Sequence, residues 1–114
     1  MVVNELSSEQ IDRIFRALAD ATRRDIVRRT LNDDIAISDL ASDYDMSFAA
    51  VQKHVAFLEA ADLVTKIPHG RRRLVKSNPE TLRYVQRLLT EFETLWRGRI
   101  DRLDALLAED APPE

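Results

Sequence analysis

The segment from Ser47 to Ala61 carries two opposite helical faces, and this pattern constrains the fold more than any other in the chain. At 100° per residue, the apolar face collects Ala50, Val51, His54, Val55, Leu58 and Ala61. The opposite face collects Phe48, Ala49, Gln52, Lys53, Ala56 and Glu59. Ser38 is suited to cap a short preceding helix, and Asp45 tolerates the left-handed backbone of a tight turn before Ser47 caps the next helix. Residues 38–61 therefore have the layout of a helix-turn-helix.

A predicted β-hairpin follows directly. Leu63 to Ile67 and Arg72 to Lys76 are rich in β-branched and long side chains. They flank Pro68-His69-Gly70-Arg71, which suits a hairpin loop with glycine at a positive φ. Residues 63–76 are therefore predicted to form a wing beside the helix-turn-helix.

Two helices are predicted before this motif. Ser7 and Gln10 have the spacing of a capping box, which begins a first helix that reaches about Ala19. Asp20 can cap a second helix that ends near Asn32, and residues 35–37 suit a short extended piece. The second helix carries four arginines interleaved with carboxylates, for which intrahelical pairing or solvation is the default interpretation and a phosphate contact the less favoured one: Arg23, Arg24, Arg28 and Arg29.

A long last helix is predicted over residues 79–108, opened by Asn78 and Pro79. Its apolar side chains alternate at spacings of three and four, and one small domain cannot cover them all. We expect a homodimer through the first and last helices, with the interface at Ile11, Phe15, Leu89, Phe92, Trp96 and Leu103. The alternative is that the helix folds back on its own core.

The fold class predicted is mainly α with a small β-hairpin wing, an α+β winged helix-turn-helix in a single domain over residues 1–108. Residues 109–114, with two prolines, are expected to be a disordered tail. The 114 residues are enough for one modest core.

Positive charge is concentrated in the middle of the chain, although the formal net charge is −3. Residues 47–76 hold 6 basic and 2 acidic side chains, against 6 and 10 in residues 1–46 and 5 and 8 in residues 77–114. A basic region on an acidic body attracts phosphate locally, so the local sign is the better guide to partners. Taken alone, such a run equally suits a solvated face.

Several classes of function find no support in the residues. The chain has no cysteine, so thiol catalysis, thiolate metal sites and disulfides are excluded. His54 lies on the apolar face without a second ligand at metal spacing, which favours a hydrogen-bonded structural histidine. No nucleophile and base pair, glycine-rich phosphate loop, signal peptide or membrane span can be assembled. We expect a cytoplasmic protein that is not an enzyme and needs no metal or cofactor.

The outward face of residues 47–59 suits the major groove of double-stranded DNA. Gln52 can read adenine, and Lys53 can contact guanine or phosphate. Phe48 can touch a thymine methyl group or pack against the preceding helix. His69 in the hairpin loop faces phosphate or solvent, and at most two of three wing arginines, Arg71, Arg72 and Arg73, can point at one groove because side chains alternate along a strand.

The stretches ALADATRRDIV, SDLASDYDMSFAAVQKHVAFLEAADLV and HGRRRLV resemble, in the same order, the ArsR/SmtB family of winged helix-turn-helix repressors. The resemblance covers about residues 11–107. It implies that the DNA-reading positions are Ser47, Phe48, Ala49, Gln52 and Lys53, and that the wing arginines contact the DNA backbone.

The chain departs from the family pattern where metals bind. Metal-sensing members carry cysteines in a run like ELCVCDL, and the matching DIAISDL places Ala36 and Ser38 there, while residues 77–114 contain no histidine. Asp45 and Asp62 replace the glycines of many relatives, and both are tolerable left-handed residues. The sequence thus predicts a homodimeric repressor that binds an inverted repeat and is not gated by metal, with any small-molecule effector unknown. The alternative is a winged-helix module that binds protein and has abandoned DNA.

Overall fold

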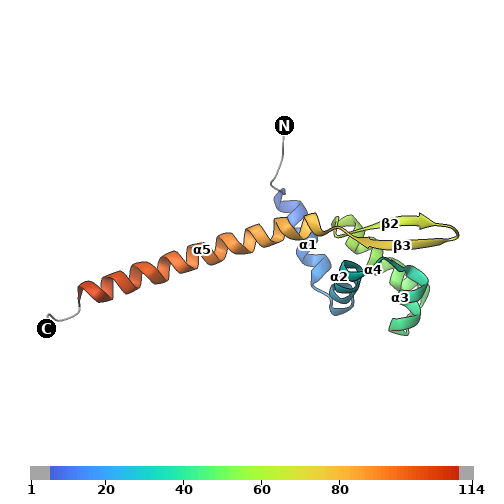
Figure 1. The fold of residues 1–114 in the computed structure, drawn as a ribbon, viewed down its shortest axis with the longest axis horizontal. Coiled ribbons are helices and arrows are strands. Elements are labelled where there is room, and N and C mark those ends of the chain that lie inside the picture. Colours follow the sequence, from blue (N-terminus) through green and yellow to red (C-terminus); the bar gives the residue numbers. More distant parts are fainter. Residues whose placement is uncertain (1–5, 111–114) are drawn as a thin grey trace. The chain divides into compact units, whose positions relative to one another are not determined.

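The structure is a computed structural model that describes residues 6–110. Helices and strands follow one another as α1 (Ser8–Leu18), α2 (Ala21–Asn32), β1 (Ile35–Ala36), α3 (Ile37–Tyr44), α4 (Phe48–Ala60), β2 (Val64–His69), β3 (Arg72–Ser77) and α5 (Pro79–Glu109) (Figure 1). The chain divides into two compact units, one ending at Tyr84 and the other beginning at Val85 within α5. The expectations for the extreme N-terminus and for residues 111–114 of the tail lie outside the described residues.

Polar caps begin α1, α2 and α4 where the sequence predicts them. The Ser7 hydroxyl accepts from the backbone N–H of Gln10 at 3.2 Å, and the Gln10 side chain accepts from the N–H of Ser7 at 2.8 Å, which completes a capping box. Asp20 accepts from the N–H of Arg23 and begins α2, and Ser47 accepts from the N–H of Ala50 and begins α4.

The predicted cap of α3 is wrong. The helix begins at Ile37, with Ala36 at its N-cap and no side-chain cap, so Ser38 lies inside the first turn. Ala36 pairs with Leu74 of β3, and Ile37 is buried. Strand pairing and burial thus set the start of this helix in place of a hydroxyl.

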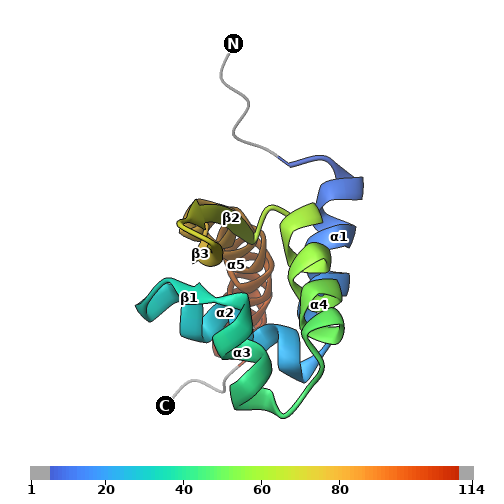
Figure 2. The same cartoon turned by 90° about the vertical axis from the view of Figure 1, so that its right-hand side faces the viewer.

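The core of the first unit forms where α4 packs against α1, α2, α3 and β2. Figure 2 shows α4 lying alongside α1, and a short turn joins α3 to α4. The largest fully buried side chains come from these four helices, from the residue before β2 and from β3: Ile14, Ile26, Leu40, Val51, Val55, Leu58, Leu63 and Val75. Asp45 closes α3 at φ 53°, which confirms the predicted left-handed turn.

The hairpin is confirmed, but its loop is shorter than predicted. Pro68 and His69 belong to β2, opposite Arg73 and Arg72, and only Gly70, at φ +64°, and the residue after it form the turn. The antiparallel sheet has the order β1-β3-β2, so β2 is an edge strand. An edge strand tolerates proline because its outer side makes no ladder hydrogen bonds, and this explains the longer strand.

Hydrogen bonds fasten the start of α5 to the chain just after α4. Asp62, at φ 58°, reverses the chain after α4. Its carbonyl accepts from the Asn78 side chain at 3.0 Å and from the Thr81 hydroxyl at 2.6 Å. From Val85 onward α5 is described by itself, as a continuous helix that ends one residue beyond the predicted boundary. Over residues 6–110, no helix has the length and apolar character needed to cross a membrane.

We predict that Ser7→Ala lowers the free energy of unfolding by about 0.5–2 kcal/mol, because it removes the capping box that begins α1. Urea denaturation at one fixed protein concentration measures this loss. Ser8→Ala is the matched control, since Ser8 is the first helical residue and makes no cap. Equal effects of the two substitutions would contradict the assignment.

Candidate nucleic-acid interface

The outward face of α4 is held in place by the burial of its inner face. Val51, Val55 and Leu58 are completely buried, and Ala50 and His54 are partly exposed. The opposite side presents exposed residues, namely Phe48, Ala49, Gln52, Lys53 and Ala56. The two faces predicted for this helix are therefore confirmed, and rotation of the helix would require the core to open.

Gln52 and Lys53 form the polar centre of this outward face. Within residues 6–110, neither side chain makes a hydrogen bond or an ion pair, so an amide and an ammonium group face solvent. Ala49 and Ala56 beside them are small, which lets a helix approach the floor of a major groove about 12 Å wide. Phe48 at the first turn is 49% exposed, so much of its ring remains available to a ligand.

The wing arginines divide into two groups. Arg72 forms an ion pair with Asp39 of α3, so this arginine reaches across to the helix-turn-helix. Arg71 in the turn and Arg73 opposite Pro68 are exposed and make no ion pair within the described part of the chain. This arrangement agrees with the expectation that at most two of the three wing arginines can point at one groove.

The hairpin is joined to both helices of the motif. Besides the pair between Arg72 and Asp39, Lys66 of β2 lies 3.3 Å from Glu59 of α4. Exposed ion pairs contribute little to stability, typically about 0.2–1 kcal/mol each. The two pairs connect the hairpin to α3 and α4, which the strands also contact by packing.

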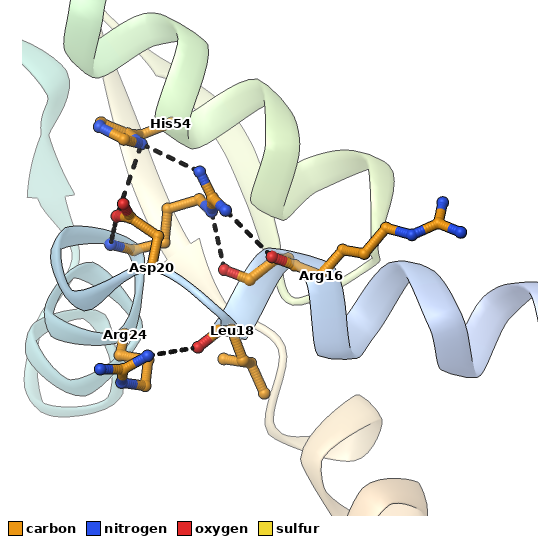
Figure 3. A network of polar contacts seen from close by, with 7 residues as sticks. Arg16, Leu18, Asp20, Arg24 and His54 are labelled. Carbon is orange, nitrogen blue, oxygen red and sulfur yellow. Dashed lines mark hydrogen bonds and ion pairs between the residues drawn. The ribbon is translucent and has the colours of Figure 1, made fainter.

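Arg23 ties the end of α1 to α4, and intrahelical pairing is the wrong interpretation for it. Its guanidinium donates to the carbonyls of Ala17 at 2.8 Å and Arg16 at 3.0 Å, and one nitrogen lies 3.5 Å from Nδ1 of His54 (Figure 3). The last carbonyls of a helix have no intrahelical partner, and the short connection to α2 brings this arginine within reach of them. Its guanidinium also lies 4.4 Å from the centre of the Phe57 ring.

His54 has the structural place that the sequence predicts. Its side chain is 20% exposed, and Nδ1 lies 3.9 Å from the Asp20 carboxylate. The backbone N–H of Arg23 holds the pKa of Asp20 below its ordinary value, helped by the charges of the Arg23 guanidinium and the His54 ring and opposed by burial. The contacts among Asp20, Arg23 and His54 join α1, α2 and α4.

The other arginines of α2 also serve the fold. Arg24 donates to the carbonyl of Leu18 at 2.7 Å, and Arg29 pairs with Asp43 of α3 at 2.6 Å, so the intrahelical interpretation is wrong for both. Arg28 does pair within its helix, with Asp25 at 3.0 Å. These contacts reach neighbouring helix ends and α3, which a pattern of charges along one helix does not reveal.

The chain is similar to known transcriptional regulators in both sequence and structure. No family model matches the chain. The HTH-type transcriptional regulator Rv2034 of Mycobacterium tuberculosis is 39% identical over 85 residues, which cover 75% of this chain and 77% of that protein. The crystal structure of an ArsR family transcriptional regulator is 33% identical, has a TM-score of 0.75, and matches over 82% of this chain and 96% of its own.

This chain belongs to the ArsR family of winged helix-turn-helix transcriptional regulators. The resemblance seen in the sequence is therefore confirmed. A solution structure of a homodimeric winged helix-turn-helix DNA-binding domain from Mycobacterium bovis is similar in fold, with 19% identity, a TM-score of 0.61, and coverage of 76% of this chain and 82% of that one.

The side chains expected at a dimer interface of this ArsR-family protein are accessible in the single chain. On α1, Phe15 is 40% exposed and Ile11 is half-buried. The others lie on α5 beyond Tyr84 and are 46–57% exposed: Leu89, Phe92, Trp96 and Leu103. Exposed large apolar side chains, repeated along the second unit, are typical of interaction sites.

Asp39 and Phe57 are the residues of the region that sequence reasoning missed. Asp39 lies on α3, 33 positions before its partner Arg72, and no local spacing links the two. Phe57 falls between the two faces assigned to α4, and its role depends on the arginine that stacks on it. Residues 6–110 hold no group of three or more His, Cys, Asp or Glu side chains suited to a metal ion.

We predict that Asp39→Asn steepens the salt dependence of DNA binding by this ArsR-family protein. The substitution frees Arg72 from its ion pair, and one further phosphate contact changes the slope of log K against log salt by about −0.9. Fluorescence anisotropy with random-sequence duplex DNA measures the slope. Asp43→Asn, also on α3, removes the same charge but frees no wing arginine, so its slope should stay unchanged; identical slopes for both variants would refute the assignment.

Proposed function

We propose that the protein is a homodimeric transcriptional repressor that binds an inverted repeat in double-stranded DNA and is not gated by metal. The observation that carries the proposal is the outward face of α4, where Gln52 and Lys53 project from a helix that is held on its inner side by three completely buried side chains. A rigid helix with small neighbours and unpaired polar side chains suits base recognition in a major groove. Family membership supports the same conclusion.

The DNA-reading residues proposed are Ser47, Phe48, Ala49, Gln52 and Lys53. All five are exposed, and they lie in or next to the first turns of α4. In helix-turn-helix proteins the N-terminal residues of the recognition helix contact the base edges. The Ser47 hydroxyl caps the helix at 3.1 Å from the N–H of Ala50, so it also holds this end of the helix in shape.

The wing is proposed to contact the flanking sugar-phosphate backbone. Arg71 and Arg73 offer guanidinium groups without carboxylate partners among residues 6–110, and His69 is exposed on the same hairpin. Arg72 reaches phosphate only by exchanging its partner Asp39 for the DNA. Such contacts position the protein and carry no sequence information.

Twofold association is proposed to place two copies of α4 in successive major grooves. The exposed apolar side chains of α1 and α5 support this, as does the homodimeric state of the related domain from Mycobacterium bovis. Half-site centres should then lie about 34–36 Å apart, or a multiple of that distance. Footprinting of the protein on its own genome tests the whole proposal, and protected sites without an inverted repeat would overturn it.

If the protein binds no DNA and instead retains a partner protein in a salt-insensitive complex, the alternative of a protein-binding winged helix is favoured.

We predict that Gln52→Ala relaxes specificity at one base pair of each half-site, because a bidentate contact to adenine is worth about 1–3 kcal/mol. Selection of binding sites from a randomised pool measures this.

We predict that the triple variant with Arg71, Arg72 and Arg73 changed to Ala binds every DNA sequence more weakly and has a flatter salt dependence, because the wing loses its phosphate contacts. A triple variant with an unchanged salt slope would show that the wing does not contact phosphate.

We predict that Trp96→Glu shifts the protein from dimer to monomer, because it places a charge in the proposed apolar interface. Sedimentation velocity at micromolar concentration reads the mass. Thr94→Glu adds the same charge on the opposite side of α5, 200° away at 100° per residue, and should leave the dimer intact. A wild-type mass equal to one chain would overturn the dimer.

We predict that zinc or arsenite leaves DNA affinity unchanged. The chain has no cysteine, and Ala36 and Ser38 stand where metal-sensing relatives carry their ligands. Titration of the metal into a preformed complex with promoter DNA, followed by anisotropy, tests this. A loss of affinity that is reversed by a chelator would show a metal site that the family pattern does not place.

A further inference from the structure

A groove of about 520 Å³ lies between α1 and α4, next to the outward face of α4. Its walls come from two helices: Arg13 and Arg16 of α1, and Lys53, Ala56, Phe57 and Ala60 of α4. This α1–α4 groove is within the size range of sites for small organic molecules, about 300–1,000 Å³. No contact described above fills it.

The α1–α4 groove has an apolar floor and a purely cationic rim. Two alanines and the half-exposed ring of Phe57 supply the floor, and the aliphatic stems of the long side chains extend it. Its charged residues are Arg13, Arg16 and Lys53, and no carboxylate lines it. Among residues 6–110, none of these three cations has an ion-pair partner. On a chain with a net charge of −3, this is a local site for an anion.

The floor of the groove is organised before any ligand arrives. Arg23 stacks 4.4 Å from the centre of the Phe57 ring and is itself fixed by the carbonyls of Ala17 and Arg16. The ring therefore has one face covered by a guanidinium that cannot move without releasing the end of α1. In Figure 3 the Arg16 side chain extends away from this network, so its own charge stays free of it.

We infer that the α1–α4 groove binds a small amphiphilic carboxylate, with its apolar body on Phe57 and the alanines and its carboxylate among the three cations. DNA phosphate could pair with the three cations, but it would leave the apolar floor of the groove uncovered. The inference rests on the proposed function for its consequence, because Lys53 belongs both to the groove and to the DNA-reading face. A carboxylate that holds Lys53 in the groove removes a cation from the DNA, so the ligand opposes DNA binding.

The first test measures binding without DNA. Isothermal titration of the full chain uses 2-naphthoate as the probe and 2-naphthalenemethanol as its neutral counterpart, and the carboxylate should bind about tenfold more tightly. The double variant Arg13→Gln and Arg16→Gln should lose that preference. The control double variant Arg28→Gln and Arg83→Gln removes the same charge at two exposed positions outside the groove and should keep it.

A steric pair of variants locates the probe. Ala60→Leu fills the α1–α4 groove and should abolish binding, while Ala21→Leu adds the same side chain at an exposed position of α2 and should not. Equal binding of carboxylate and alcohol, binding unaffected by Ala60→Leu, or no binding at all would overturn the site. Binding that weakens as protein concentration rises would also overturn it, because a second copy of the chain would then occupy the groove.

The second test measures coupling. Saturating 2-naphthoate should weaken promoter binding about five- to tenfold at 0.1 M salt and flatten the salt slope by about 0.9, the effect of one lost phosphate contact. Promoter binding that does not respond to a bound ligand would overturn the regulatory role. If the Arg13 and Arg16 variant itself flattens the slope without ligand, the groove is part of the DNA interface and the inference fails. A protein that binds the probe but no DNA would refute the proposed function and leave the site standing.

Discussion

Burial of one side of α4 is the constraint on which the remaining structure depends. Val51, Val55 and Leu58 have no exposed surface, and each would lose about 1.5–3 kcal/mol of burial if the helix turned. Because the inner side is held by α1, α2, α3 and β2, the outer side has only one orientation. The positions of Gln52 and Lys53 are a consequence of core packing, and no contact of their own is needed to hold them.

Arginine serves two purposes in this protein, and the surroundings of each guanidinium separate them. Arg23 and Arg24 satisfy carbonyls at the end of α1, where a helix leaves backbone acceptors without partners. Arg29 and Arg72 reach carboxylates on α3 and so set the position of this helix against α2 and the hairpin. Tyr44 strengthens the contact between α2 and α3, because its hydroxyl donates to Asp25 and the Arg29 guanidinium lies over its ring. The cations proposed to meet DNA are Arg71 and Arg73 on the wing tip and Lys53 on α4.

The α1–α4 groove and the proposed DNA-reading face share a helix and one lysine, and this proximity is the physical basis of the proposed control. Neither the groove nor the proposed DNA-reading face has to change its fold, because the ligand and the DNA would compete for the charge of Lys53. Arg23 donates to carbonyls at the end of α1 and lies beside His54 of α4, so this network links the two helices that form the groove. A regulator that has no cysteine, and no metal cluster within residues 6–110, can by this proposal respond to an organic anion.

Local chemistry determined most of the fold from the sequence alone. Hydroxyl and carboxylate caps at Ser7, Asp20 and Ser47, left-handed turns at Asp45 and Asp62, and the two faces of α4 all act within a few residues, so their spacing can be read directly. The helix-turn-helix, the wing and the outward face of α4 were predictable for this reason. The start of α3 was not, because pairing of Ala36 with Leu74 sets it from 38 positions away. Tertiary structure alone decided which arginines are free, because the partners of Arg23, Arg29 and Arg72 lie on other elements. It also decided the α1–α4 groove, whose walls meet only when two helices that are distant in the sequence pack together.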